Sequence, residues 1–134
     1  MDSSKLISGK NYMECDKTIK DQVVLIKILE KRIDMDKSPD FKKELLSWLV
    51  HDSPNLVIDL AQVDYMDSSG LGALLFGIRQ AKRFHGNLVV TNLCSKVKKL
   101  LEIAHLTKTI IIFKSESEAL KYFAQAKNNG LERT

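Results

Sequence analysis

Residues 56–72 read LVIDLAQVDYMDSSGLG. The first five of these residues are apolar except for one aspartate and follow Ser53-Pro54, as expected for a short buried strand bounded by a turn. From residue 71 to residue 78, leucine and isoleucine recur every three or four positions, which is the spacing of an amphipathic helix. The stretch therefore predicts a strand, a polar loop and a helix, the repeating unit of an α/β fold.

The alternation of apolar and amphipathic stretches continues on both sides of this unit. Helices are expected to begin near Ser38, Ser95 and Ser115, with Ser95 capping its helix and a capping box at residues 115–118. Further strands are expected at Gln22–Leu29, Leu88–Thr91 and Ile110–Phe113, with an edge strand at Tyr12–Cys15 and a turn at Asp16 and Lys17. We therefore predict a single α/β domain with a mixed, mostly parallel sheet, an antiparallel N-terminal edge hairpin and about four helices.

The length of 134 residues, of which 44% are hydrophobic, suits one domain with a sizeable core. We expect residues 1–10 to form a flexible segment, 11–127 the domain and 128–134 a tail. The apolar runs are strand-sized, well short of the ~20 residues that a membrane helix requires. The N-terminus lacks the apolar core of a signal peptide. We therefore expect a cytoplasmic protein without a membrane partner.

The distribution of charged residues, histidines and cysteines argues against nucleic-acid and metal partners. No acidic residue lies between Asp67 and Glu102, where six lysines and arginines fall. No recognition motif or aromatic cluster accompanies them, so we expect no nucleic-acid partner. The three histidines and two cysteines do not show the spacing of metal ligands. We expect no metal and no cofactor.

The loop before the central helix is the most distinctive part of the chain. Asp67 and Ser68 fall where side-chain oxygens can cap the first free amides of the helix. Gly70 and Gly72 would leave the first turn open to another chain or to an anion. A well-capped helix without any further role fits the same residues.

Three chemical interpretations of this loop compete. A phosphate cradle for a nucleotide at Gly70–Gly72 would need a further glycine or a following Gly-Lys-Ser/Thr. A nucleophilic Ser68 would need a preceding glycine together with histidine and acid partners. A phosphoacceptor serine needs only exposure at a helix N-terminus, where the amides stabilise the added charge. The last interpretation makes the fewest demands on the sequence.

The segments 56–60 and 63–72 closely resemble the STAS domain of bacterial anti-sigma factor antagonists. The resemblance extends in element order over about residues 20–125. Ile33-Asp34 also matches the Leu-Asp that follows the second strand in that family. The chain departs from the pattern at Lys31, where family members usually carry glycine. The resemblance implies the STAS fold.

The resemblance also implies a non-enzymatic phosphorylation switch. In that family, the first serine after the aspartate is phosphorylated by an anti-sigma factor that is also a serine kinase. The unphosphorylated form binds this kinase and frees the sigma factor, and a metal-dependent serine phosphatase resets the cycle. Carried over, the phosphoacceptor is Ser68, with Ser69 as the second candidate. The partner-binding positions are Asp34, Asp67, Ser69, Gly70, Leu71 and Gly72.

One expectation goes beyond the resemblance. Lys96, Lys98 and Lys99 fall in the first turns of a helix, where cations oppose the helix dipole. We expect this lysine cluster to border the Ser68 loop, with Lys96 contacting a partner or the phosphate. Solvated side chains without a role remain an alternative for the cluster. For the chain as a whole, the alternatives are a STAS module of a stress-signalling or lipid-transport assembly, a serine-nucleophile enzyme and a nucleotide-binding protein.

Overall fold

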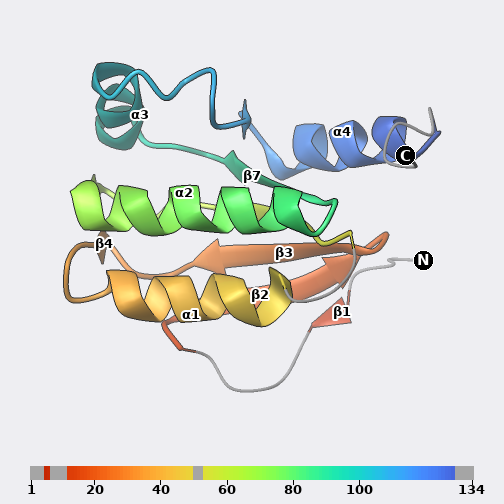
Figure 1. Ribbon diagram of the computed structural model, residues 1–134, viewed down its shortest axis with the longest axis horizontal. Coiled ribbons are helices and arrows are strands. Elements are labelled where there is room, and N and C mark those ends of the chain that lie inside the picture. Colours follow the sequence, from red (N-terminus) through yellow and green to blue (C-terminus); the bar gives the residue numbers. More distant parts are fainter. Residues whose placement is uncertain (1–4, 7–11, 50–52, 129–134) are drawn as a thin grey trace.

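The computed structural model describes residues 5–6, 12–49 and 53–128 (Figure 1). Six strands form one sheet in the order β1-β2-β3-β5-β7-β8. The first three strands pair antiparallel, and the pairs from β3 to β8 are parallel. The elements are β1 (Lys5–Leu6), β2 (Cys15–Lys20), β3 (Val23–Ile28), β4 (Arg32–Ile33), α1 (Ser38–Leu49), β5 (Asn55–Asp59), β6 (Tyr65–Met66), α2 (Ser68–Arg83), β7 (Asn87–Thr91), α3 (Ser95–Ile103), β8 (Ile112–Phe113) and α4 (Glu116–Asn128). The predicted class, with its mixed sheet and four helices, is confirmed.

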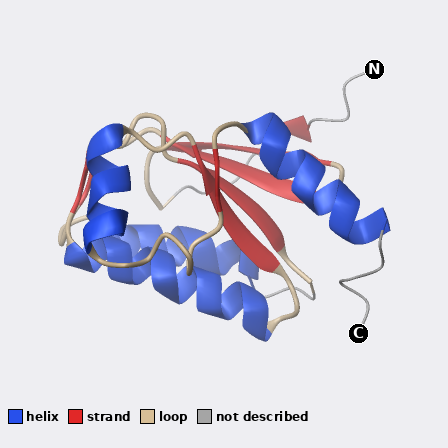
Figure 2. Ribbon diagram, turned by 90° about the horizontal axis from the view of Figure 1, so that it is seen from above, coloured by secondary structure: helices blue, strands red, loops and turns tan. Residues whose placement is uncertain are grey.

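The helices cover both faces of the sheet. Helices α1 and α2 lie side by side on one face, and α4 lies on the other (Figure 2). On the first face, side chains such as Leu45 and Leu74 join one buried cluster with Ile26 and Ile58 of the sheet. On the second face, Phe123 of α4 packs in a smaller cluster with Leu25, Val57 and Val89, which lie on the opposite side of the sheet from Ile26 and Ile58. In the described part of the chain, none of the helices has the length and apolar composition required to span a bilayer.

The N-terminal hairpin forms, but not where the sequence predicts it. The strand begins only at Cys15, and the turn lies at Asp21 and Gln22, which adopt φ values of 52° and 68°. The expectation of a strand at Tyr12–Cys15 with a turn at Asp16 and Lys17 is therefore wrong. The physical reason is Lys17, which faces the interior because its ammonium pairs with the buried carboxylate of Glu44 at 2.9 Å.

Strand β1 is an element that the sequence does not predict. Its two residues, Lys5 and Leu6, pair with Ile19 and Thr18 of β2 and extend the antiparallel edge. The rest of the segment 1–10 lies outside the described residues, as does most of the tail 128–134.

The helix starts follow the sequence closely, with one displaced cap. Helix α3 begins at Ser95 itself, and Cys94 occupies the cap position without a side-chain hydrogen bond, so the expectation that Ser95 caps this helix is wrong. At α4 the Ser115 Oγ accepts from the amide of Glu118 at 3.2 Å. The Glu118 carboxylate in turn accepts from the amide of Lys114 at 3.0 Å. The first bond confirms the cap by Ser115, whereas the second engages the amide one residue before the one that a capping box uses.

A second, two-stranded sheet positions the loop before α2. Strand β4 pairs in parallel with β6, so that Arg32 lies opposite Tyr65 and Ile33 lies opposite Met66. This pairing holds the segment after β3 against the segment that leads into α2. Residues about thirty positions apart in sequence are therefore neighbours at the N-terminus of α2.

Candidate functional site

Asp67 organises the N-terminus of α2. Its Oδ1 accepts from the amides of Ser69 and Gly70, each at 3.0 Å, and from the Ser69 hydroxyl at 2.6 Å. Its Oδ2 accepts from the amide of Met35 at 3.1 Å. One carboxylate therefore caps the helix, as the sequence predicts, and also fixes the loop after β4 beside it.

The two serines of the motif have different environments. Ser68 is exposed, and within the described residues no hydrogen bond or histidine engages its hydroxyl. Ser69 is half-buried, and its hydroxyl donates to Asp67. Ser68 therefore offers the reactive group to solvent, whereas the hydroxyl of Ser69 is already used in the cap.

Asp34 lies in the loop that Asp67 holds. Its Oδ1 accepts from the amides of Asp36 and Lys37 at 3.1 Å and 3.3 Å, and its Oδ2 forms an ion pair with Arg32 at 3.5 Å. Its backbone carbonyl accepts from Ser38, the first residue of α1. Asp34 therefore shapes the turn into α1, and the hydrogen bond between Met35 and Asp67 brings both aspartates to the same end of the molecule.

The glycines of the motif serve different purposes. Gly70 is buried, and a Cβ atom there would clash with the backbone carbonyl of Ile33 in β4. Leu71 is also buried, in the core beneath α2. Gly72 is exposed, with open space around the position of a Cβ atom. Close packing of α2 on β4 thus requires Gly70, and only Gly72 leaves the helix surface open.

Alanine substitutions separate these two glycines. Gly70→Ala is expected to destabilise the domain by about 1–3 kcal/mol, because β4 must shift to admit the methyl group. Gly72→Ala is expected to be neutral or to stabilise by up to about 1 kcal/mol, since alanine is the better helix former. Urea unfolding followed by circular dichroism measures both, and equal effects at the two positions would contradict this packing.

The hydrogen bonds of Asp67 shift its titration. The bond from the Ser69 hydroxyl, followed by the bond from the Gly70 amide, holds the pKa of the Asp67 carboxyl below its ordinary value of 3.8. Because the folded-state pKa is the lower one, the stability linked to this group is fully present above that ordinary value. It is lost as the pH falls through the folded-state pKa.

An NMR titration of the Asp67 side-chain carboxyl should therefore give a midpoint below 3.8. The Met35 amide should report the same midpoint, because it donates to the same carboxylate. Asp67→Asn, which cannot titrate, is the control and should abolish this transition at Met35. A carboxyl that titrates at or above its ordinary value would contradict the observed cap.

The loops that follow the parallel strands β5, β7 and β8 meet at one rim of the sheet. The Cys94 thiol donates to the carbonyl of Val63 at 3.3 Å, which joins the loop after β7 to the loop before α2. The Asn92 amide donates to the carbonyl of Phe113 at 3.3 Å, which joins the same loop to the end of β8. Helix α3 and the N-terminal end of α2 accordingly lie at the same end of the molecule (Figure 1).

Lys96, Lys98 and Lys99 are exposed on α3. The helix also packs against β6, the strand that immediately precedes Asp67 and Ser68. The lysine cluster therefore lies on an element that adjoins the Ser68 loop. A contact between Lys96 and a partner remains a prediction.

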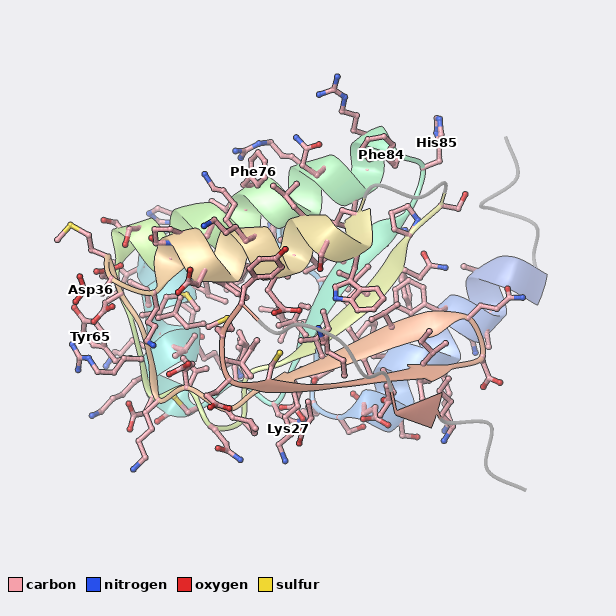
Figure 3. All side chains as sticks on the ribbon, turned by 90° about the horizontal axis from the view of Figure 1, so that it is seen from below. Lys27, Asp36, Tyr65, Phe76, Phe84 and His85 are labelled. Carbon is pink, nitrogen blue, oxygen red and sulfur yellow. The ribbon has the colours of Figure 1, made fainter. Side chains whose placement is uncertain are left out.

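Two exposed apolar residues beside the site are not anticipated from the sequence. Met35 is 73% exposed, although its amide is bound to Asp67. Tyr65 is 40% exposed and carries the Arg32 guanidinium 4.0 Å from its ring centre. Tyr65 and Asp36 extend from the same end of the molecule (Figure 3). A lone methionine within the charged run 31–37 is the signal that could have revealed this surface.

Comparison with known proteins agrees with this geometry. The sequence model of the STAS domain matches residues 14–119. The anti-sigma-B factor antagonist of Listeria monocytogenes is 34% identical over 86 residues, which cover 64% of this chain and 75% of the relative.

Two solved structures illustrate the shared fold. An anti-sigma factor antagonist from Mycobacterium paratuberculosis superimposes with a TM-score of 0.73 at 22% identity, covering 87% of this chain and 97% of the other. The Bacillus cell fate determinant SpoIIAA, solved in its phosphorylated form, superimposes with a TM-score of 0.57 at 15% identity, covering 90% and 98% of the two chains.

Proposed function

The chain belongs to the STAS domain family, and from this premise we propose that it is an anti-sigma factor antagonist controlled by phosphorylation of Ser68. The unphosphorylated form binds an anti-sigma factor that is also a serine kinase, and this binding releases the sigma factor. A metal-dependent serine phosphatase restores the unphosphorylated form. The observation that carries the proposal is the exposed hydroxyl of Ser68 at the N-terminus of α2, next to the hydroxyl of Ser69, which donates to Asp67.

The position of Ser68 suits a switch that acts through an interface. A phosphate there lies at the positive end of α2, so the helix tolerates the added charge of roughly −1.5 to −2. The same phosphate lies one residue from the carboxylate of Asp67, at the end of the molecule that also carries Asp34. A partner that covers this surface would have to bury a dianion beside carboxylates, which is costly without matching cations.

The surroundings of Ser68 supply the contacts for a partner. Exposed Met35 lies on the loop that Asp67 holds in place. The Arg32–Tyr65 stack lies beside it on the paired strands β4 and β6. Methionine, tyrosine and arginine are residue types that interfaces favour. Gly72 leaves room along α2, whereas Gly70 and Leu71 support the surface from below. We assign Lys96 to the margin of this interface.

A displacement experiment tests the proposal. The unmodified chain is added to a preformed complex of the host's sigma factor and its anti-sigma factor, and the products are separated by gel filtration. The expected result is a complex of this chain with the anti-sigma factor, together with free sigma factor. Met35→Asp, which places a charge on the contact surface, should weaken displacement. Ala124→Asp makes the same charge change at an exposed residue of α4, on the opposite face of the sheet, and should leave displacement unchanged. Failure of every anti-sigma factor of the host to bind the unmodified chain would overturn the proposal.

A further inference from the structure

An open cavity of about 650 Å³ lies beside α3, where β7 and β8 end. Its volume falls within the range of small-molecule sites, which is roughly 300–1,000 Å³. None of the residues that line it belongs to the Ser68 motif. The lining residues are Asn92, Leu93, Lys98, Glu102, Thr107, Ile112, Phe113 and Lys114.

Four separate segments build this cavity. The loop after β7 contributes Asn92 and Leu93, and α3 contributes Lys98 and Glu102. The connection from α3 to β8 contributes Thr107, and β8 contributes its two residues together with Lys114, which follows them. Asn92 adopts a left-handed conformation with φ of 60°, and its backbone amide donates to the backbone carbonyl of Phe113. The backbone thus turns sharply at the cavity margin and is hydrogen-bonded there, so the margin is held by the fold itself.

The cavity combines an apolar floor with a positive rim. Leu93 and Ile112 are half-buried and form the apolar part, whereas the ring of Phe113 packs against Tyr122 of α4 on the other face of the sheet. Lys98 on α3 and Lys114 after β8 stand on different segments, and no ion pair engages either ammonium within the described ranges. Glu102 is the single carboxylate in the lining, so the lining carries a net positive charge.

We propose that this cavity binds a small organic anion with an apolar body. The anionic group lies between the ammonium groups of Lys98 and Lys114, and the apolar body covers Leu93 and Ile112. Asn92, Thr107 and Glu102 are placed to accept or donate hydrogen bonds at the margin, which favours a ligand that also carries an N–H or O–H donor. This binding site is independent of the phosphorylation of Ser68, so either proposal can fail without the other.

The probe 1-anilinonaphthalene-8-sulfonate has the required chemistry: a sulfonate, an aromatic body and one N–H donor. Titrated against the full chain, it should show saturable binding at one site, with affinity that falls as salt is added. Backbone amide NMR shifts should centre on Asn92, Thr107 and Lys114. The absence of saturable binding, or shifts centred elsewhere, would overturn the proposal.

Charge reversal provides a matched control for the lysines. Lys98→Glu and Lys114→Glu are each expected to weaken binding of the probe about tenfold, because each removes an attraction and adds a repulsion. Lys99→Glu makes the same change on the same helix at an exposed residue outside the cavity, and it should alter the affinity less than twofold. Equal losses in all three variants would show only a general charge effect and would contradict the site.

Discussion

Phosphorylation of Ser68 is expected to weaken binding of the anti-sigma factor by more than a hundredfold. The unmodified hydroxyl is exposed at the head of α2, beside the carboxylate of Asp67 and near the exposed side chain of Met35. An interface over this surface must desolvate the added dianion, and an unfavourable change of about 3 kcal/mol suffices for this loss of affinity. The helix itself should persist, because the phosphate lies at its positive end.

Isothermal titration calorimetry of the unmodified and the phosphorylated chain measures this change directly. Ser68→Ala should bind the anti-sigma factor with or without ATP, since it cannot be modified at this position. Ser69→Ala is the matched control, and it should still lose affinity when ATP and kinase are present. A phosphorylated chain that binds within tenfold of the unmodified one would contradict the proposed switch.

The second large effect concerns stability. Glu44→Ala is expected to lower the free energy of unfolding by about 3–5 kcal/mol, because it removes the carboxylate that balances the charge of the buried Lys17 ammonium. Glu44 is 0% exposed and Lys17 is 5% exposed, and their charged atoms lie 2.9 Å apart. Glu44 also accepts from the amide of Tyr12 at 2.8 Å and from the Trp48 indole at 3.4 Å, so its loss removes these hydrogen bonds as well.

Urea unfolding followed by circular dichroism checks this expectation. Arg32→Ala, which removes one side of the exposed pair with Asp34, is the control and should cost less than about 1 kcal/mol. The double variant Lys17→Met with Glu44→Leu should be more stable than Glu44→Ala, because it removes both charges together. If Glu44→Ala is as stable as the unmodified chain, or if the double variant is the less stable of the two, the account of this ion pair is wrong.

Cys15 lies beside the same buried pair. Burial, followed by the nearby negative charge of Glu44, raises the pKa of the Cys15 thiol to about 12. The thiol therefore stays protonated at neutral pH, and a protonated thiol is a poor nucleophile. The environment of Cys15 is therefore that of a structural cysteine.

The sequence predicts the parts of the fold that have a clear period. The unit from β5 to α2 could be predicted because the centre of its strand is apolar and the apolar residues of its helix recur every three or four positions. The N-terminal strand could not, since Lys17 reads as a turn residue unless its partner Glu44, 27 positions away, is known. The β4–β6 pair has only two residues in each strand, too few to show any periodicity.

The candidate site could be predicted in its residues but not in its geometry. The motif predicts Ser68 as the phosphoacceptor and Asp67 as the cap of α2, and the structure confirms the cap. The hydroxyl of Ser69 takes part in the cap through a hydrogen bond to Asp67, and the spacing of residues in the sequence does not reveal this bond. The link from Asp67 to Met35 spans 32 positions, and the burial of Gly70 depends on the position of β4. These features arise from tertiary contacts between short segments.

Intact-mass analysis after incubation with the host's candidate serine kinases and ATP tests the phosphoacceptor most directly. We predict the addition of one phosphate to the unmodified chain and to Ser69→Ala, and none to Ser68→Ala. Incorporation into Ser68→Ala at the same level, or no incorporation into the unmodified chain by any of these kinases, would contradict the central claim that the exposed hydroxyl of Ser68 is the switch.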